Sequence, residues 1–223
     1  MNGDIAVLHT GPFGVNTCVV RLEGSRVFIV DPAACAFCGD ESRITDFLRD
    51  EGLDAVAVVL THGHFDHVCG LPQLRSSFPE IPILIHKRDA GFIGRNSTET
   101  QAAHLAPLRF AAFLPAVTDL PEATAFLEDG ALSFNALFEG WQVLHTPGHT
   151  EGSCCLYNKE RKCLISGDTL FYRSCGRTDL PGGDELAMEQ SLRRLYAELP
   201  ADTAVYPGHE RYGFPLKEGG TLW

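Results

Sequence analysis

Hydrophobic and polar positions alternate along much of this chain in short runs that predict β-strands separated by turns. In the first third such runs cover 5–8, 17–22 and 27–30, with 23–25 as a hairpin-like connection. Residues 40–50 have helical spacing instead, because Ile44, Phe47 and Leu48 share one side and Ser42 or Asp40 can cap the first turn. We expect further strands at 55–60 and 81–85, and a second helix at 68–77.

The second half repeats this pattern after an irregular stretch. Residues 87–123 are compatible with helix from 100 to 113 but are interrupted by Pro107 and Pro115, so we expect helices and loops that pack over the functional site. Strand-like runs return at 125–127, 131–134, 141–145, 154–157 and 163–165, followed by a helix at 185–199 and a strand at 203–206. Helices that can only pack outward predict an α/β fold with two sheets face to face and helices on both outer surfaces.

Composition narrows the class of protein. The chain has 223 residues, 44% of them hydrophobic, which is enough for one domain over 1–223. A formal charge of -11 with no visible basic patch argues against a nucleic-acid partner. Residues 1–10 have neither a basic leader nor a long apolar stretch, and no later segment reaches membrane-spanning length, so we expect a soluble cytoplasmic protein without a membrane partner. The eight cysteines are scattered, which favours reduced thiols.

The chemistry concentrates first in residues 62–67. His62, His64, Asp66 and His67 place three imidazoles and a carboxylate within six positions, directly after the apolar run 55–60. Because an extended backbone points alternate side chains the same way, His62 and His64 share a face, and a turn into a helix could bring Asp66 and His67 beside them. This arrangement can hold two cations.

Three other strand candidates also end at potential metal ligands. The runs 141–145, 163–165 and 203–206 lead into His149, Asp168 and His209. Since sheet proteins usually place ligand sites at the carboxyl ends of strands, all four ends could converge on one pocket. Five imidazoles and two carboxylates suit divalent transition metals better than calcium or magnesium, and zinc is our first expectation.

These motifs together resemble the metallo-β-lactamase superfamily, and within it the glyoxalase II (hydroxyacylglutathione hydrolase) branch. The resemblance runs in order through the segments 61–67, 146–150, 167–171 and 207–209. It implies a four-layer αββα sandwich with the site at one edge of the two sheets. It also implies two divalent ions, zinc with iron or manganese as alternatives: one held by His62, His64 and His149, a second by Asp66, His67 and His209, with Asp168 bridging both.

The reaction that this resemblance implies is hydrolysis of a small-molecule thioester such as S-lactoylglutathione. Two cations on either side of one water lower its pKa, and the bridging hydroxide can attack a carbonyl that a metal polarises. Asp66 is the expected catalytic residue, because its carboxylate can orient the hydroxide or take its proton. A thiolate of pKa near about 8.5 leaves without much help from an acid, which suits a site with no obvious extra proton donor.

Specificity for glutathione depends on features beyond the metal ligands. Arg177 lies where glyoxalase II-like enzymes carry a cation that contacts the glutathione carboxylate, and an internal ion pair with Asp179 is an equal alternative. Glyoxalase II proper adds a helical domain after its last metal histidine, whereas only residues 210–223 follow His209 here. The chain is therefore most similar to short relatives without that domain.

Other chemistry-bearing residues have plainer interpretations. Cys35 and Cys38 form a CxxC that could be redox-active or half of a zinc knuckle, but no second spaced pair exists, so we expect no special chemistry. Four more histidines lie away from the motifs or at a strand end and are expected to be structural or exposed. They are His9, His86, His104 and His145.

Three alternative functions remain open. A persulfide dioxygenase-like oxidoreductase would use one iron held by His62, His149 and Asp168. A non-catalytic metal-stabilised domain is disfavoured, because structural zinc sites are usually closed cages rich in cysteine. A lactamase or lactonase role is compatible with the superfamily, although the absence of a secretory leader argues against antibiotic hydrolysis outside the cytoplasm.

Overall fold

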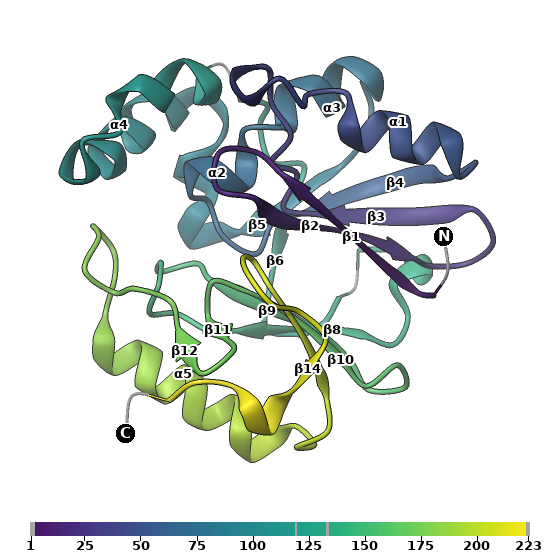
Figure 1. Cartoon of the computed structure of the whole chain (residues 1–223), viewed down its shortest axis with the longest axis vertical. Coiled ribbons are helices and arrows are strands. Elements are labelled where there is room, and N and C mark those ends of the chain that lie inside the picture. Colours follow the sequence, from purple (N-terminus) through teal and green to yellow (C-terminus); the bar gives the residue numbers. More distant parts are fainter. Residues whose placement is uncertain (1–2, 119, 133, 222–223) are drawn as a thin grey trace.

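Two six-stranded sheets form the centre of the molecule in the computed structural model, which describes residues 3–118, 120–132 and 134–221 (Figure 1). In the first sheet β1 to β6 lie in chain order. The pairs β1–β2 and β2–β3 are antiparallel, whereas β3, β4, β5 and β6 run parallel. Its strands are β1 (Ile5–Thr10), β2 (Val15–Arg21), β3 (Arg26–Val30), β4 (Asp54–Val59), β5 (Ile83–His86) and β6 (Ala125–Leu127).

The second sheet has the order β14-β13-β10-β9-β8-β7, and a separate ribbon pairs β11 with β12. Within this sheet β10 and β13 are parallel and the other neighbours are antiparallel. Its strands are β7 (Gly130–Ala131), β8 (Trp141–His145), β9 (Cys154–Asn158), β10 (Cys163–Gly167), β13 (Ala204–Pro207) and β14 (Phe214–Pro215); the ribbon is β11 (Leu170–Phe171) and β12 (Ser174–Cys175).

Helices cover both outer faces of this pair of sheets, which confirms the expected α/β sandwich. In Figure 1 α1 and α3 lie on the outer side of the first sheet and α5 on the outer side of the second. None of the helices in the described ranges is both long and apolar enough to cross a bilayer. The α-helices are α1 (Arg43–Asp50), α2 (Phe65–Val68), α3 (Leu71–Ser77), α4 (Ser97–Leu108) and α5 (Glu185–Glu198). Short 3-10 helices are η1 (Ala36–Cys38), η2 (Lys87–Phe92), η3 (Gly94–Asn96), η4 (Ala111–Val117), η5 (Ala136–Phe138) and η6 (Leu216–Glu218).

The alternating strand pattern builds three separate cores. In β3, Val27 and Ile29 pack with the helices above the first sheet, while Phe28 and Val30 face the second sheet. The same alternation of strand side chains places Leu164 of β10 against α5. Each sheet is therefore buried on both faces, and the layers are held by continuous apolar surface.

The region around the helix expected at 68–77 contains two short helices, α2 and α3. The segment predicted as a single helix at 68–77 breaks between α2 and α3, because the Gly70 N–H donates to the Pro32 carbonyl at 2.9 Å. A Cβ at Gly70 would lie 2.6 Å from that carbonyl oxygen, so only glycine permits the approach. The break turns α2 away from α3 and lets α2 carry Asp66 and His67.

The stretch at 87–123 forms helices and loops beside the site, as expected, whereas the strand at 131–134 differs from expectation. Pro107 does not interrupt the helix there, since α4 ends one residue later at Leu108, where the missing N–H removes only a terminal hydrogen bond. Of the strand expected at 131–134 only Ala131 is paired, in β7, and residue 133 lies outside the described residues.

Candidate metal centre

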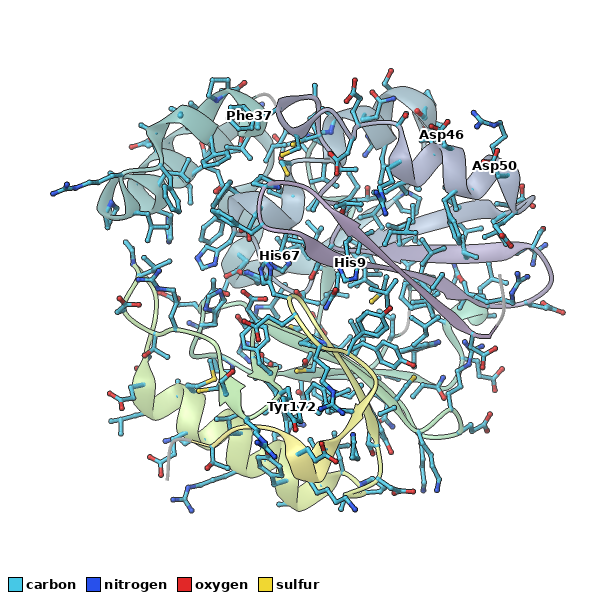
Figure 2. The ribbon with its side chains drawn as sticks, viewed as in Figure 1. His9, Phe37, Asp46, Asp50, His67 and Tyr172 are labelled. Carbon is cyan, nitrogen blue, oxygen red and sulfur yellow. The ribbon has the colours of Figure 1, made fainter. Side chains whose placement is uncertain are left out.

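Seven side chains predicted as metal ligands come together at one edge of the sandwich. They follow the carboxyl ends of β4, β8, β10 and β13, and Asp66 and His67 lie on α2. Figure 2 shows His67 at the junction between the N-terminal half, in purple to teal, and the C-terminal half, in green to yellow. All seven are buried or nearly so: His62, His64, Asp66, His67, His149, Asp168 and His209.

His62, His64 and His149 form the first of two clusters. One ligand atom from each lies within 4.8 Å of the others. His64 Nδ1 and His149 Nε2 are 2.8 Å apart, and the ring centroids of His62 and His149 are separated by 4.8 Å. Three imidazoles at this spacing can surround one cation.

Asp66, His67 and His209 form the second cluster, again within 4.8 Å of one another. His67 Nε2 lies 3.2 Å from His209 Nε2, and Asp66 Oδ2 lies 3.3 Å from the same nitrogen of His209. Asp168 joins the clusters: its Oδ1 is 3.4 Å from His67 Nε2 and its Oδ2 is 3.6 Å from His149 Nε2.

Hydrogen bonds on the outer side of the rings fix which imidazole nitrogen faces the centre. His149 Nδ1 donates to the Arg177 carbonyl at 2.8 Å. His62 Nδ1 lies 3.1 Å from Thr61 Oγ1, which accepts because its own hydrogen goes to the Asp31 carboxylate. In both rings Nε2 is left with a lone pair that points inward, the form in which histidine binds metals.

Asp31 performs the same task for His67 and is a residue that the sequence analysis missed. His67 Nδ1 donates to Asp31 Oδ2 at 3.0 Å, and Thr61 donates to the same carboxylate through its N–H and its hydroxyl. Asp31 is buried and has a φ of 51°, a left-handed conformation that Asp tolerates better than most residues. It follows directly after the strand 27–30, so the strand-end rule used for the other ligands would have found it.

Burial and the neighbouring carboxylates have opposite effects on the pKa values of the histidines in this centre. Burial lowers the pKa of His62 and of His64 well below the usual value, so both rings are neutral. Burial also disfavours charge on His67, but the carboxylates of Asp168 and Asp66 outweigh it and raise the pKa of His67 well above normal. The two carboxylates thus draw positive charge to this point, as a site for cations would.

Buried atoms without partners test whether metal ions fit here. Among the described atoms, His62 Nε2, His64 Nε2 and Asp168 Oδ1 are buried and make no hydrogen bond. An unsatisfied buried polar atom costs free energy, and such atoms are rare in folded proteins. A cation in the first cluster would give His62 Nε2 a partner, and one in the second cluster would do the same for Asp168 Oδ1, which lies 3.4 Å from His67 Nε2, so the residues present fit a metal centre.

Glycine and a second buried carboxylate keep the loops close together. A Cβ at Gly208 would lie 2.2 Å from Asp168 Oδ1 and 2.6 Å from His67 Cε1. Asp89, also missed in the sequence, accepts hydrogen bonds from Gly63 N–H, Gly152 N–H and the Thr150 hydroxyl at 2.7–2.9 Å. It ties the loop that carries His62 and His64 to the loop that carries His149. It lies four residues after the run 81–85, but the backbone N–H groups that it accepts from have no signature in the sequence.

A cavity of about 160 Å³ opens beside the two clusters. His64, Asp66, His149 and Asp168 line its metal-facing side. The rest of its wall is mainly aromatic and aliphatic, from Phe13, Phe65, Leu108, Phe110 and Leu180, together with His104 and Arg177. The cavity therefore offers space for an apolar group next to the reactive centre.

Two polar side chains of this wall had been considered in the sequence. Arg177 forms a two-point ion pair with Asp179, with Nε–Oδ1 and Nη2–Oδ2 distances of 2.7 and 2.8 Å, and it also lines the cavity. His104, expected to be a structural or exposed histidine, is in neither cluster, but its ring lies 5.6 Å from that of His64. His86 and His145 stack on each other at 4.1 Å, and the exposed His9 contacts Tyr212.

Residues 10–209 match the metallo-beta-lactamase superfamily, and the chain belongs to that superfamily. The superfamily binds divalent metals, and this chain has His/Asp clusters that could hold them. The chain is 37% identical to an uncharacterized protein of Aquifex aeolicus, over 92% of this chain and 89% of the relative. It is 30% identical to the probable metallo-hydrolase YqgX of Bacillus subtilis (91% and 88% covered) and 29% identical to the hydroxyacylglutathione hydrolase GloC of Haemophilus influenzae (94% and 92% covered).

Solved structures show the same fold. The BLEG-1 B3 metallo-beta-lactamase superimposes with a TM-score of 0.79 at 28% identity, covering 96% of this chain and 95% of that chain. TTHA1623, solved in a di-iron-bound form, gives 0.77 at 31% identity with 95% of each chain covered. ETHE1 from Myxococcus xanthus gives 0.71 at 22% identity, covering 96% and 80%, and this likeness concerns the fold alone.

Proposed function

We propose that this protein is a binuclear metal-dependent hydrolase that acts on thioesters of the hydroxyacylglutathione type. The observation that carries the proposal is the pair of facing His/Asp clusters with Asp168 between them. His62, His64 and His149 would hold one divalent cation and Asp66, His67 and His209 the other, with Asp168 shared. Zinc is the cation that five imidazoles and two carboxylates favour, with iron and manganese as alternatives.

The cations would supply Lewis acidity, which lowers the pKa of water and polarises a carbonyl oxygen. The side chains of the protein position the attacking water and the metal-binding rings. Asp66 lines the cavity and lies 3.3 Å from His209, so its carboxylate can orient the attacking water and hold its proton. Asp31 and Thr61 keep the rings of His67 and His62 in the tautomers that leave Nε2 free.

A thioester suits the polar groups around this cavity. Its thiolate leaves without a strong acid, because the pKa of a free thiol is about 8.5. The walls formed by Phe13, Phe65 and Phe110 accommodate an apolar part of the substrate. Arg177 can bind a substrate carboxylate on the same wall if its pairing with Asp179 is shared with the ligand. The named activity of the Haemophilus influenzae relative supports this assignment.

A mononuclear iron oxidoreductase that uses only His62, His149 and Asp168 is the second candidate, which the sequence analysis left open. It would leave the second cluster without a task, although Asp66, His67 and His209 lie as close together as the first cluster does. The binuclear hydrolase is therefore the better account of the buried charges.

The proposal is tested on the purified protein by elemental analysis together with an assay of thioesters. We expect two metal ions per chain, and hydrolysis of S-lactoylglutathione or a simpler acyl thioester that stops on chelation and returns with added Zn²⁺. One iron per chain with oxygen uptake on a glutathione persulfide would establish the oxidoreductase instead. Absence of metal-dependent turnover of every thioester tried would overturn the proposal.

Matched histidine variants separate a role in the centre from a general effect of substitution. His67→Gln removes a member of the second cluster, and we expect it to lose one metal equivalent and nearly all activity. His9→Gln changes an exposed histidine outside both clusters and should retain both metals. Equal metal content and activity in the two variants would contradict the assignment of His67.

A further inference from the structure

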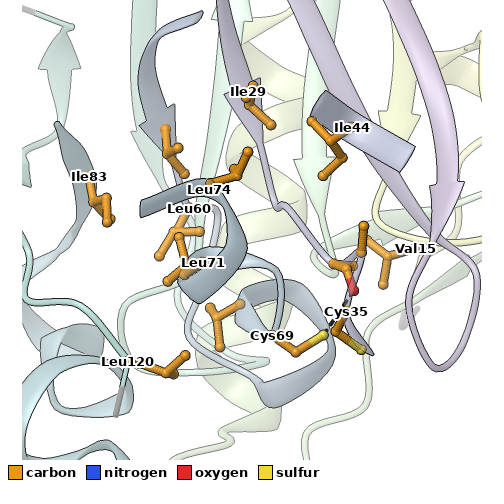
Figure 3. Packing of buried hydrophobic residues seen from close by; sticks show 14 of the residues in the cluster. Val15, Ile29, Cys35, Ile44, Leu60, Cys69, Leu71, Leu74, Ile83 and Leu120 are labelled. Atoms are coloured by element: carbon orange, nitrogen blue, oxygen red, sulfur yellow. Dashed lines mark hydrogen bonds between the residues drawn. The ribbon is translucent and has the colours of Figure 1, made fainter. Parts of the chain in front are cut away.

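Three cysteines meet on the side of α2 that faces the loop between β3 and α1. Cys35 lies in that loop, Cys69 follows the last residue of α2, and Figure 3 shows their side chains close to each other at the edge of the core. Both are buried, whereas Cys38 is exposed. The Cys35 and Cys38 sulfurs lie within 4.8 Å of each other, and the Cys69 thiol donates to the Ala33 carbonyl at 2.9 Å. None of the eight cysteines, all of which lie in the described ranges, forms a disulfide in the structure.

A tight turn brings a carboxylate to the same place. The 3-10 helix η1 turns back so that Cys38 N–H donates to the Cys35 carbonyl at 3.0 Å, and Gly39 continues the turn with a φ of 69°. Asp40 follows with its side chain directed to the start of the turn. The Cys35 and Cys38 sulfurs and a carboxylate oxygen of Asp40 all lie within 4.8 Å of one another.

Backbone groups hold the Asp40 carboxylate in this orientation. Its Oδ1 accepts from Cys35 N–H at 2.8 Å and its Oδ2 accepts from Gly11 N–H at 2.8 Å. Each oxygen keeps a further lone pair, and hydrogen-bonded carboxylates are the usual condition of metal ligands. The donors are thus positioned before any ion binds.

We propose that Cys35, Cys38 and Asp40 form a second metal site, outside the histidine centre, that binds a thiophilic divalent cation such as Zn²⁺. Zn²⁺ takes cysteine sulfur and carboxylate oxygen as ligands, and two thiolates select it over hard cations. Three donors leave a fourth position for water, and the Cys69 thiol lies against Cys35 as another soft donor.

The protonation of the thiols and the access of solvent to the cluster both bear on this site. Interactions with Cys69 and then Cys38 lower the pKa of the Cys35 thiol to about 6, against the opposing effect of burial, so Cys35 offers the thiolate that metals bind. Burial and then the Cys35 charge raise the pKa of the Cys38 thiol to about 12, so a bound ion would have to displace the Cys38 proton. A cavity of about 500 Å³ opens over Cys35 and Cys69, bounded by Phe37 and Pro115. An ion can therefore enter from solvent without unfolding the loop.

The position of the cluster indicates what a bound ion would do. The same loop contacts the end of α2 through Pro32, whose carbonyl accepts from Gly70 N–H at 2.9 Å, and through Ala33, whose carbonyl accepts from Cys69 Sγ at 2.9 Å. It starts at Asp31, which holds His67. An ion at Cys35 and Cys38 would fasten the loop that positions this part of the histidine centre.

The test uses Cd²⁺ as a probe, with the fully reduced full-length protein. Because none of the seven residues of the histidine centre is a cysteine, thiolate-to-metal charge-transfer absorption in the ultraviolet reports ions bound by cysteine and not those in the histidine centre. We expect this absorption to saturate at one equivalent, beyond any ions held by histidines. A reduced protein that takes up Cd²⁺ with no charge-transfer absorption would overturn the proposal. Neither result depends on catalytic activity.

Cysteine and carboxylate variants locate the signal. Cys38→Ser changes an exposed residue and should fold, yet it should weaken Cd²⁺ binding at this site by at least about 100-fold, since even outer-shell changes cost 10–100-fold. Asp40→Asn should also weaken binding while leaving the absorption per bound ion unchanged, because both sulfurs remain. Cys175→Ser, in β12 outside the cluster, is the matched control and should bind as the wild type does. Unchanged affinity in Cys38→Ser would refute the assignment.

Discussion

Asp31→Asn should change the tautomer of His67, because asparagine keeps the shape of the side chain at position 31 but not its two acceptor oxygens. The Asp31 carboxylate accepts from Thr61 N–H at 2.8 Å, from the Thr61 hydroxyl at 2.6 Å and from His67 Nδ1 at 3.0 Å. An asparagine keeps one oxygen for Thr61 N–H but places an amide NH₂ where Oδ2 stood. His67 must then present an unprotonated Nδ1 to that group, and its proton moves to Nε2.

The size of the effect follows from which nitrogen faces the second cluster. His67 Nε2 lies 3.2 Å from His209 Nε2 and 3.4 Å from Asp168 Oδ1, so a proton there occupies the position of a ligand lone pair. Losing the outer partner of a metal-binding histidine typically costs 10–100-fold in affinity, or about 1.4–2.8 kcal/mol. The first cluster should be affected less, because Asp31 makes no direct hydrogen bond to His62, His64 or His149 in the described structure.

The measurement is a competitive Zn²⁺ titration that resolves two binding constants, combined with nitrogen NMR of the histidine rings. We expect Asp31→Asn to weaken one constant by 10–100-fold, and the nitrogen spectrum to show a change of tautomer in one histidine. The fold should persist, since Asn tolerates a φ of 51°. Asp46→Asn, on the surface of α1, is the matched control. Two wild-type binding constants in Asp31→Asn would refute the reasoning that an outer hydrogen bond sets the ligand nitrogen.

Three further predictions concern the framework around the centre. Gly208→Ala should reduce kcat/KM by about 100-fold, because a methyl group would lie 2.2 Å from Asp168 Oδ1. The far-ultraviolet circular dichroism should stay unchanged. Gly91→Ala is the control and should stay active, since the nearest atom to its added methyl group would be 3.6 Å away. Asp89→Ala should lower the free energy of unfolding in urea by about 3 kcal/mol, since three buried donors lose their acceptor; a loss below about 1 kcal/mol would show that water replaces the carboxylate. The hydrogen bond from Arg194 lowers the pKa of Asp129 below 3.8, so that pair stabilises the fold above this value and its contribution disappears as the pH falls through the lower folded pKa. Asp129→Asn should therefore be less stable than wild type by under about 1 kcal/mol at neutral pH, because the Arg194–Asp129 pair is exposed and screened by solvent. The difference in stability should vanish in acid. A difference that stays constant at all pH values would contradict the role of this pair.

Strands that are buried on both faces were predictable because they are continuous apolar runs bounded by turns. In β3 the order Val27, Phe28, Ile29, Val30 already assigns side chains to two opposite cores, and the structure fills both. Strands of two residues, such as β11 and β14, were missed because so short a run has no period. Helix α4 was misplaced because its proline lies in the last turn, where it costs little.

The candidate site was predictable in its inner side chains and not in the groups that orient them. Each of the seven proposed ligands follows a strand, and residues of those types after a strand are a signal that local sequence carries. Asp31 carries the same signal and was overlooked. Asp89 also follows a strand, four residues after the run 81–85, but it accepts from backbone N–H groups such as those of Gly63 and Gly152, and any residue except proline supplies such a donor, so its role has no signal in the sequence.

The convergence of the two clusters depends on hydrogen bonds between the two halves at that same edge. Cys154 N–H donates to the Thr61 carbonyl at 2.8 Å, and Asn16 N–H donates to the Gly208 carbonyl at 2.7 Å. Each bond joins the first sheet to the second within one or two residues of His62 or His209. Because a metal ion shared through Asp168 would cross the same junction, ion binding and the docking of the two sheets must stabilise each other. Removal of metal should therefore loosen this edge first, while the apolar layer around Phe28 and Trp141, which contact each other with ring centroids 5.2 Å apart, keeps the sheets together.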